Sequence, residues 1–409
     1  MKAYILFPFL SLFVLLACQK EEVRTEPVPI EITQKAQEVL RANNQFGLDL
    51  LKKAFEENGD KNLMISPLSV SQALSMTYNG ANSSTKTAFE NVLHYTGQTT
   101  LEVNQASYDL TTALLKIDPK IIIKIANSIW YKKEFTVEQD FITTNQKYYN
   151  AEVKALDFNN PASKDIINAW VNEKTNKKIQ KIVNAINSDD VMFLINAIYF
   201  KGVWKAEFDK KLTEIKPFYL SKGTVKNLET MQIEHEFSVF YEQKYSAIEL
   251  PYGQGNYSMI ILLPIDDSSL TELIKQLDEQ VWSNLIQKLA SPAKINLKLP
   301  KFKFEYENEL NNELSDLGLG IAFSDFADFT GINKNGGLTI TKVKHKTFVE
   351  VNEEGTEAAA VTSVTVGVTS AGPNSNVFAV DHPFLFAIKE KYTNAILFLG
   401  IVTDPSLAK

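Results

Sequence analysis

The 409-residue chain contains a single cysteine, Cys18, and only four histidines. One cysteine excludes an internal disulfide, so the folded body must be held together by its buried core. The histidines His94, His235, His345 and His382 are scattered, and no zinc-protease, hydrolase-elbow, phosphate-loop or dinucleotide motif occurs. A net charge of −7 and the absence of a long basic run argue against a nucleic-acid partner. We therefore expect a protein that is not an enzyme and that has no metal or cofactor site.

The first segment of the chain is apolar and indicates export. Met1-Lys2 gives a basic start, residues 3–16 are nearly all apolar, and the run ends in Leu15-Leu16-Ala17-Cys18. The run is too short for a transmembrane helix of about 20 residues. Its ending resembles a bacterial lipoprotein processing site, in which Cys18 would be lipidated and would become the first mature residue. An ordinary signal peptide with a chance cysteine is the alternative.

A short tether is expected to follow the signal peptide of residues 1–17. Residues 18–30 contain Pro27 and Pro29 and few apolar side chains. The residue after Cys18 is Gln19 and not the aspartate that would resemble an inner-membrane retention signal. Lys20-Glu21-Glu22 weakly resembles a surface-export signal. We expect an exported protein, anchored to the bacterial outer membrane only through lipid on Cys18, with surface exposure left open.

The rest of the chain, residues 31–409, is expected to form one domain because no linker, charge block or repeat divides it. Helical periodicity is clear from Ala36 to Phe55, and Ser66-Pro67 is typical of a helix start. Further helices are expected at 165–175 and 270–289. Strand-like runs occur at 121–131, 191–200, 246–250, 257–263, 295–304, 338–351, 384–388 and 396–402. Helices concentrate in the first half and strands in the second, which predicts an α+β fold.

The segment from Glu353 to Ser370 carries most of the functional information. Between residues 356 and 368 it contains no proline, lysine or arginine, and one charge, Glu357. With a period of two, one face is uncharged and begins with small residues, as a strand entering a packed sheet requires. That face contains Thr356, Ala358, Ala360, Thr362, Val364, Val366 and Val368. The other face, with Glu357 and Ser363, would tolerate water. The polar turn at 370–376 then predicts an exposed loop, although an ordinary edge strand is the alternative.

This segment resembles the reactive-centre loop hinge of inhibitory serpins. The matching hinge residues are Glu353, Gly355, Thr356, Ala358, Ala359 and Ala360. Other stretches are similar to serpin sequences in the family's order, namely 62–69, 193–204, 327–332, 344–346, 382–386 and 398–400. The resemblance covers residues 31–405. It implies the serpin fold, with a large mixed central sheet, smaller sheets, about nine helices and an exposed reactive-centre loop at about 353–377.

The same resemblance implies a set of residues that control conformation. Serpins have a polar cluster where the middle strands of the main sheet part, and an indole under the upper end of that gap. The cluster falls on Ser66, Ser69, Asn196 and His345, and the indole on Trp204. A buried hydrogen-bonded network of this kind can hold a gap shut and reconnect after a strand inserts. We expect these five residues to control conformation and none to be catalytic.

The resemblance also implies suicide inhibition of a protease. The target would cleave the loop, form an acyl-enzyme and be trapped when the loop inserts as a strand. Family spacing from Gly355 places the cleaved bond at Thr369–Ser370, with Val368 and Val366 as alternatives. No lysine or arginine occurs from residue 355 to 380, so proteases that need a basic residue have no site there.

The expected partners are therefore elastase-like and subtilisin-like serine proteases, with papain-like cysteine proteases as a further candidate class. We expect the inhibitor to be a monomer. A non-inhibitory serpin that serves as a surface binding protein or carrier is the rival interpretation, although serpins of that kind often have proline or charge in the hinge.

Overall fold

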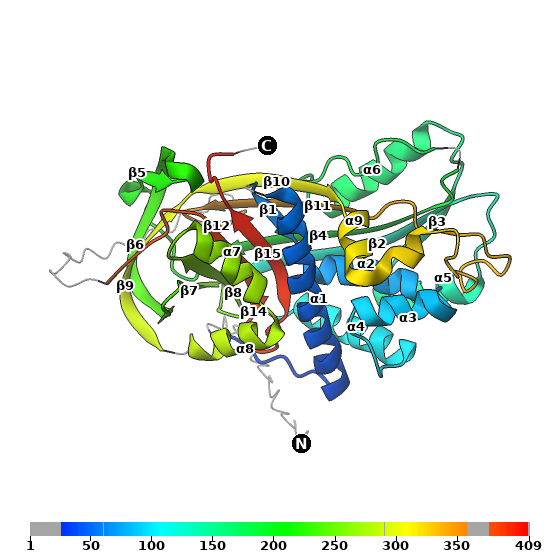
Figure 1. The fold of residues 1–409 in the computed structure, drawn as a ribbon, viewed down its shortest axis with the longest axis horizontal. Helices are drawn as coiled ribbons and strands as arrows, with labels where there is room; N and C mark the ends of the chain where they lie inside the picture. Colours follow the sequence, from blue (N-terminus) through cyan, green and yellow to red (C-terminus); the bar gives the residue numbers. More distant parts are fainter. Residues whose placement is uncertain (1–25, 60, 188, 290, 358–375, 408–409) are drawn as a thin grey trace, which may run out of the picture.

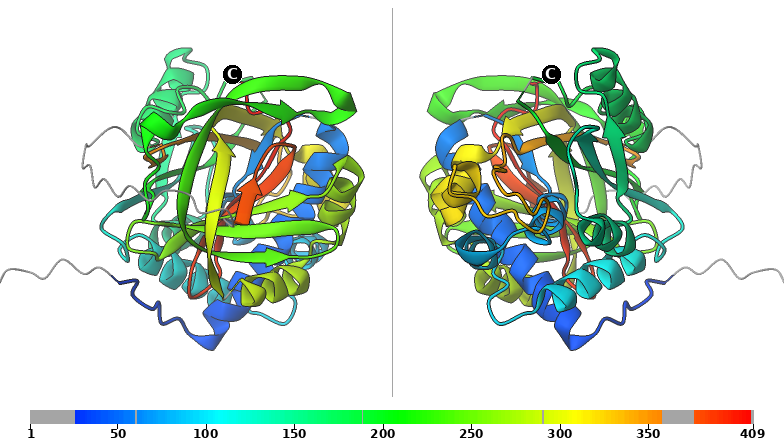
Figure 2. Two further views of the ribbon diagram at one scale, coloured as in Figure 1. Left: turned by 90° about the vertical axis from the view of Figure 1, so that its left-hand side faces the viewer. Right: turned by 90° about the vertical axis from the view of Figure 1, so that its right-hand side faces the viewer.

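The computed structural model describes residues 26–59, 61–187, 189–289, 291–357 and 376–407. Its helices gather around two β-sheets (Figures 1 and 2), which confirms the α+β fold. The α-helices in these ranges are α1 (Gln34–Asn58), α2 (Pro67–Tyr78), α3 (Ser83–Val92), α4 (Thr100–Leu114), α5 (Gln139–Tyr149), α6 (Ala162–Lys174), α7 (Asp267–Gln276), α8 (Glu279–Lys288) and α9 (Asn311–Leu314). None of the helices within the described ranges is long and apolar enough to cross a membrane.

The first sheet has six strands in the order β10-β11-β12-β4-β2-β3. Its strands are β2 (Ile121–Lys132), β3 (Glu152–Leu156), β4 (Met192–Val203), β10 (Phe302–Glu309), β11 (Lys344–Asn352) and β12 (Gly355–Thr356). The pairing is antiparallel except between β2 and β3, so the sheet is mixed as predicted.

The second sheet has nine strands, of which eight form its main path and one flanks it. Its strands are β1 (Leu63–Ile65), β5 (Glu214–Tyr219), β6 (Val225–Tyr241), β7 (Tyr245–Tyr252), β8 (Tyr257–Pro264), β9 (Pro292–Pro300), β13 (Asn376–Ala379), β14 (Phe384–Glu390) and β15 (Ile396–Val402). The 17-residue β6 pairs with β9 along one part of its length and with β7 along another. It therefore joins the smaller sheets expected from the resemblance into one continuous sheet. β14 and β15 are buried at every position, which explains why both read as unbroken apolar runs.

Helix α2 lies in the centre of the molecule, where it contacts both β4 and β15. Eleven of its twelve residues are buried, although many of them are polar. As predicted, the Ser66 hydroxyl caps the helix by accepting from the Ser69 N–H at 3.2 Å, and Pro67 occupies its first turn. A helix between two sheets has no solvent-facing side, so its polar side chains must bond to neighbouring elements. This requirement places the polar network described below.

Three sequence-based boundaries were wrong. The helix expected at 270–289 is divided into α7 and α8, because Asp278 starts a new helix by accepting from Val281 N at 2.8 Å. The strand expected at 295–304 is divided after Pro300 into β9 and β10. Residues 338–343 form no strand, because single bonds such as Ile340 N to Ala322 O tie them to neighbouring loops instead of a ladder. Helices α3, α4 and α5 had no sequence prediction.

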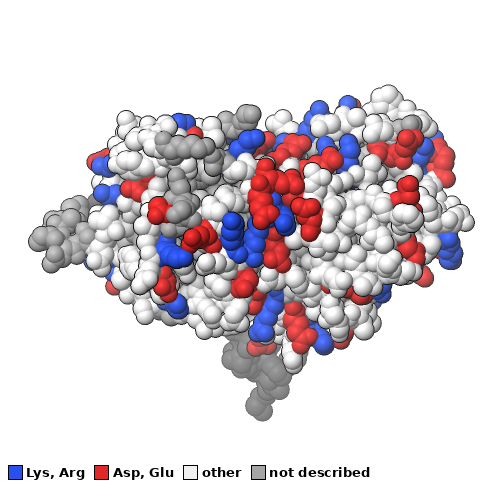
Figure 3. All heavy atoms as spheres, viewed as in Figure 1, with Lys and Arg blue, Asp and Glu red and all other residues white. Residues whose placement is uncertain are grey.

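Charges of both signs are intermixed on the face of the molecule shown in Figure 3. One exposed ion pair of the described residues joins Lys244 and Glu272, 2.6 Å apart, whose side chains are both more than half exposed. Such exposed pairs contribute little stability, so the fold depends on the core between the sheets.

Candidate functional site

The hinge enters the six-stranded sheet as the two-residue strand β12. Gly355 and Thr356 pair with Asn352 and Val351 of β11 on one side. On the other side they pair with Val203 and Gly202 at the end of β4. No ladder joins β4 directly to β11 among the strands that the structure describes. Of the hinge residues that the structure describes, two, Gly355 and Thr356, are therefore already in the gap between these strands.

Gly355 is required by the closeness of β4. A Cβ at this position would lie 2.0 Å from the Gly202 carbonyl oxygen and 2.8 Å from the Val203 Cα. Both obstacles are backbone atoms, which cannot move away without disrupting β4. A glycine is therefore the residue that allows the turn after β11 to return against β4.

Thr356 points into the interior, as the alternation of the segment predicted. It is 3% exposed, and its hydroxyl lies 2.5 Å from the hydroxyl of Tyr252. The ring of Tyr252 is stacked on Trp204 at a centroid distance of 4.4 Å. The Trp204 indole N–H donates to the Asn352 carbonyl at 2.9 Å. Trp204 thus lies at the upper end of the gap, where the resemblance placed it, and fixes the turn between β11 and β12.

Both glutamates of the turn between β11 and β12, Glu353 and Glu354, are held by residues outside the six-stranded sheet. Glu353 is 5% exposed, and its carboxylate accepts from Thr213 at 2.8 Å and lies 3.5 Å from the Lys301 amine. Burial alone would raise the pKa of Glu353, but hydrogen bonds from its own backbone and from Thr213, together with Lys301, hold it below the usual value. Glu354 pairs with Lys210 at 2.5 Å. The start of the hinge is therefore tied to two elements outside the sheet.

Glu357 was expected on a face that water tolerates, and this expectation was wrong. Its side chain is 3% exposed and lies 2.8 Å from the amine of Lys178, which follows α6. Burial raises the pKa of Glu357 above its usual value, even though Lys178 and Tyr199 oppose the shift. Its backbone is left-handed, with φ 57°, so the extended conformation of β12 ends here. The cause is this left-handed turn at Glu357, which carries the carboxylate to Lys178 and Tyr199 rather than into solvent.

The polar cluster predicted from the resemblance is assembled as a connected network below the hinge. The Ser66 N–H donates to His345 Nε2 at 3.1 Å, which links α2 to β11. The Ser69 hydroxyl donates to the Asn196 side-chain oxygen, which links α2 to β4. The cap bond between Ser66 and Ser69 connects the two halves. The N-terminus of α2 thus bridges the two strands that no direct ladder joins.

Two members of this network had no sequence prediction. Asn127 of β2 accepts from the Asn196 amide, and Gln72 of α2 accepts from both asparagines at 3.3 and 3.4 Å. Asn127 also donates to the Tyr149 carbonyl at 2.7 Å. A polar residue in the middle of an apolar strand was the available signal, but the sequence did not show which helix would meet it.

His345 is held neutral inside the protein. It is 4% exposed, and burial lowers its pKa from 6.5 to about 4. Because Nε2 accepts from Ser66 N, the ring proton must be on Nδ1. A protonated ring could not accept this bond, so protonation would break the link between β11 and α2.

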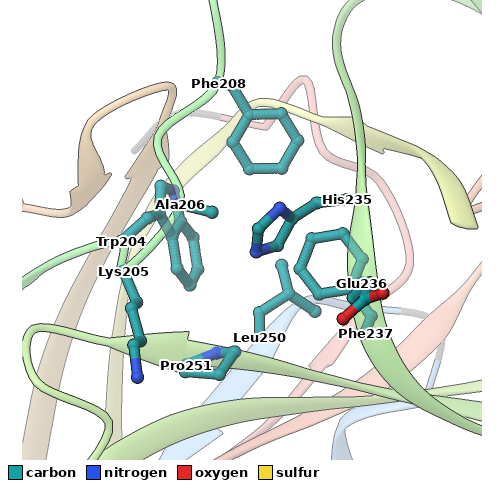
Figure 4. A pocket seen from close by; sticks show the side chains of 9 residues that line it. All are labelled: Trp204, Lys205, Ala206, Phe208, His235, Glu236, Phe237, Leu250 and Pro251. Carbon is teal, nitrogen blue, oxygen red and sulfur yellow. The ribbon is translucent and has the colours of Figure 1, made fainter. Parts of the chain in front are cut away.

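A small cavity of about 40 Å³ lies next to Trp204 (Figure 4). The ring of His235 projects into it from β6, between Phe208 and Leu250. The cavity is too small for a typical organic ligand, whose pockets are about 300–1,000 Å³. The described residues also contain no group of three or more His, Cys, Asp or Glu side chains that could hold a metal ion.

Several predicted residues lie outside the described ranges. They are Cys18, the hinge residues Ala358, Ala359 and Ala360, and the reactive-bond candidates Val366, Val368, Thr369 and Ser370. The structure brings together the four residues of the polar cluster and, separately, the hinge residues Glu353, Gly355 and Thr356 with Trp204.

The comparisons with known proteins agree with this geometry. The family model described as "Serpin (serine protease inhibitor)" matches residues 41–405. An uncharacterized serpin-like protein of Methanosarcina acetivorans is 34% identical over 377 residues, which cover 91% of this chain and 87% of that protein. The leukocyte elastase inhibitor of Homo sapiens is 36% identical over 377 residues, which cover 89% of this chain and 98% of that protein.

Solved structures show the same fold. The native state of tengpin, a thermophilic serpin, matches with a TM-score of 0.82 and 33% identity, over 93% of this chain and 97% of that one. Thyroxine-binding globulin in complex with thyroxine matches with a TM-score of 0.80 and 26% identity, over 90% of this chain and 99% of that one.

Acid is expected to weaken the link through His345. Its folded-state pKa of about 4 lies below the ordinary 6.5, so its contribution is complete above pH 6.5 and is lost as the pH falls toward 4. The loss should reach about 3 kcal/mol. We expect the thermal-unfolding midpoint of His345→Gln to depend less on pH between 6.5 and 4 than the midpoint of the unsubstituted protein. Identical slopes in the two proteins would contradict the assignment.

The pair between Lys178 and Glu357 can be measured by a double-mutant cycle. Lys178→Met leaves a buried carboxylate without its cation and should lower the free energy of unfolding by about 1–2 kcal/mol. In a Glu357→Gln background the same change should have little effect, because a neutral amide needs no counterion. Urea unfolding of the four proteins gives the coupling energy, and additive losses would show that the pair does not hold the hinge.

Proposed function

The chain belongs to the serpin family, and from this premise we propose that it is an inhibitory serpin, which traps a protease by inserting its cleaved loop into the six-stranded sheet. The matching family model is described as a serine protease inhibitor, and the leukocyte elastase inhibitor is among the relatives. The observation that carries the proposal is the position of β12. Its two residues occupy the first rungs of a gap whose two walls, β4 and β11, are otherwise not paired with each other within the described residues.

The register of β12 defines where an inserted strand would lie. Each residue further along the loop moves one residue back along both β11 and β4. Six residues beyond Thr356, the inserted strand would place Thr362 opposite His345 on β11. The same step places Thr362 opposite Asn196 on β4. A small polar residue would therefore meet the network that bridges the closed gap, and could replace bonds that insertion breaks.

The inserted strand would be much more stable than the exposed loop. The walls offer rungs from Glu350 to Lys344 on β11, with matching residues on β4. Roughly ten new ladder bonds at about 1 kcal/mol each, with apolar burial, would drive insertion by about 10 kcal/mol or more. Insertion of fifteen residues at about 3.3 Å each would carry an attached protease about 50 Å.

The loop composition supports a class of targets. Residues 355–380 contain no lysine or arginine, and the candidate bond Thr369–Ser370 is flanked by small and β-branched residues. Elastase-like and subtilisin-like serine proteases accept such residues. Papain-like cysteine proteases recognise an apolar residue one position before the residue at the cleaved bond, and Val368 would occupy that position before Thr369. Attack on the loop would form an acyl bond to the protease and release the amine of Ser370.

A carrier is the second candidate function, because thyroxine-binding globulin in complex with thyroxine has the same fold. The cavity beside Trp204 is about 40 Å³, which does not suit a ligand of that kind. A hinge without proline or bulky residues is further support for inhibition.

The proposal includes export and anchoring. The segment ending at Ala17-Cys18 supports cleavage after residue 17, lipidation of Cys18 and attachment to the bacterial outer membrane. Whether the domain faces the periplasm or the outside does not change the mechanism.

The direct test is a covalent adduct. The mature protein is mixed with an elastase-like protease and analysed by denaturing electrophoresis and mass spectrometry. We expect an SDS-stable band at the summed mass and a released peptide that begins at Ser370. Complete cleavage without an adduct would exclude inhibition of that protease and favour the carrier function.

The register can be tested with a matched pair of substitutions. Thr362→Arg places a charge on the face that would enter the core, and we expect adduct formation to fall at least tenfold as the protein becomes a substrate. Ser363→Arg places the same charge on the opposite face and should retain most inhibition. The measured quantity is the number of inhibitor molecules consumed per protease trapped. Equal effects at the two positions would show that the register is different.

A further inference from the structure

The chain reaches the folded body earlier than the sequence indicated. Pro27 and Val28, which we assigned to the tether, lie against the hairpin turn between β7 and β8. The Val28 N–H donates to the Asn256 side-chain oxygen at 3.0 Å, and the Asn256 amide donates to the Val28 carbonyl at 2.7 Å. The Tyr392 hydroxyl donates to the Pro27 carbonyl at 3.2 Å. A nine-residue interval from Cys18 to Pro27 spans at most about 30 Å.

Three further segments meet at this same turn. The Lys205 N–H donates to the Pro251 carbonyl at 2.8 Å, and the Lys391 N–H donates to the Asn256 carbonyl at 2.8 Å. The Gln254 N–H donates to the Asp118 carboxylate at 2.8 Å. The point where a Cβ of Gly255 would stand is 3.6 Å from the Lys205 amine and 3.9 Å from Pro27 Cγ. The docked residues Pro27 and Val28 therefore lie at a turn that is contacted by segments carrying lysines.

We name the exposed side chains of these segments the anchor-side patch. Its members are Leu115, Lys116, Lys120, Lys205, Lys391 and Tyr392. None of its four lysines forms an ion pair with any part of the chain that the structure describes. Leu115 and Tyr392 are 40% and 39% exposed, and Lys205 extends away from Trp204 (Figure 4).

The acids near the patch do not cancel its charge. Asp118 is 5% exposed and faces inward, where it accepts from the Gln254 and Lys120 N–H groups. Glu26 and Glu31 are exposed on the docked segment. Glu207, two residues after Lys205, is also exposed, so the four patch lysines face three exposed carboxylates on or beside these segments. The lysines still outnumber the acids there, on a chain whose net charge is −7.

We propose that the anchor-side patch rests on the anionic headgroups of the membrane that holds the lipid on Cys18. The proposal depends on the lipidation of Cys18 proposed above. It adds a second membrane contact beside the lipid, whereas the sequence suggested the lipid as the sole membrane contact. Lysines bind anionic lipid headgroups, while a half-exposed tyrosine and leucine are suited to the boundary between water and lipid. The tether length selects this occupant, because it holds the patch within about 30 Å of the bilayer.

Two weak contacts combine when they are linked. With the lipid inserted, the patch meets the membrane at a high effective concentration, so four lysines are sufficient to orient the domain. Each lysine near an anionic surface should strengthen the contact about fivefold at low ionic strength, and salt should weaken it.

The test uses the mature, lipidated protein reconstituted into vesicles. One set contains zwitterionic lipid only, and the other contains about one-third anionic lipid. Vesicle flotation reports anchoring, and lysine acetylation followed by mass spectrometry reports which amines are covered. Lys177 and Lys181 are exposed and serve as controls. They follow α6, which lies at the upper edge of Figure 1, whereas the first described residues lie at the lower edge.

We expect the four patch lysines to be acetylated at least threefold more slowly in anionic vesicles, with the protection lost at high salt and the controls unchanged. Flotation without protection would overturn the patch proposal and leave the anchor intact. Protection in both vesicle types would show proximity without charge recognition and would also overturn it. Failure to float would remove the anchor and the patch together, while leaving protease inhibition unaffected. Protection by a soluble sulfated polysaccharide, but not by anionic vesicles, would assign the patch to a glycan.

A variant with all four lysines changed to glutamine provides the matched comparison. It should float like the unsubstituted protein and form the same protease adduct, because none of the four contacts the hinge strand. A glutamate-specific protease should cleave this variant after Glu26 and Glu31 at equal rates on both vesicle types. In the unsubstituted protein, cleavage at the same two positions should be slower on anionic vesicles only.

Discussion

The structure depends on one missing ladder. β4 and β11 lie on either side of the two-residue β12, and the described residues show no direct ladder between them. Strands in the middle of a sheet normally satisfy their backbone groups through their neighbours. Here the connection is made instead by side chains at the N-terminus of α2, from His345 through Ser66 and Ser69 to Asn196. In the proposed insertion, the added strand would replace this side-chain bridge between β4 and β11.

The position of α2 follows from that arrangement. A helix buried on all sides is usually apolar, yet α2 and its cap contain Ser66, Ser69 and Gln72 in the interior. Each is satisfied by a neighbouring strand or by the helix itself, so the polar residues do not weaken the core. His345 fits the same logic because it is neutral and accepts a backbone N–H. The network is therefore stable as long as its members stay uncharged, which burial ensures near neutral pH.

The sequence predicted the chemistry of the hinge better than its geometry. Period-two alternation correctly turned Thr356 inward, because alternation depends only on an extended backbone. It failed at Glu357, where the left-handed conformation ends the extended chain and burial against Lys178 follows. The start of α2 was predictable because Ser66 and Pro67 act locally. Asn127 and Gln72 were not, since their roles depend on which helix packs on which strand. The docking of Val28 was also missed, because its partner Asn256 is distant in the sequence.

The direction of the proposed loop insertion is compatible with the proposed membrane contact. β4 and β11 run along the long axis of the molecule, whereas the first described residues, which lead into α1, lie at the lower edge of Figure 1. A strand added between them would carry an attached protease about 50 Å along that axis, which exceeds the roughly 30 Å that the tether can span. If the movement were directed at the bilayer, the anchored domain would have to be lifted or the protease pressed into lipid. With the patch on the membrane as proposed, the protease would instead move along the surface, and neither the lipid anchor nor the tether would oppose the proposed insertion.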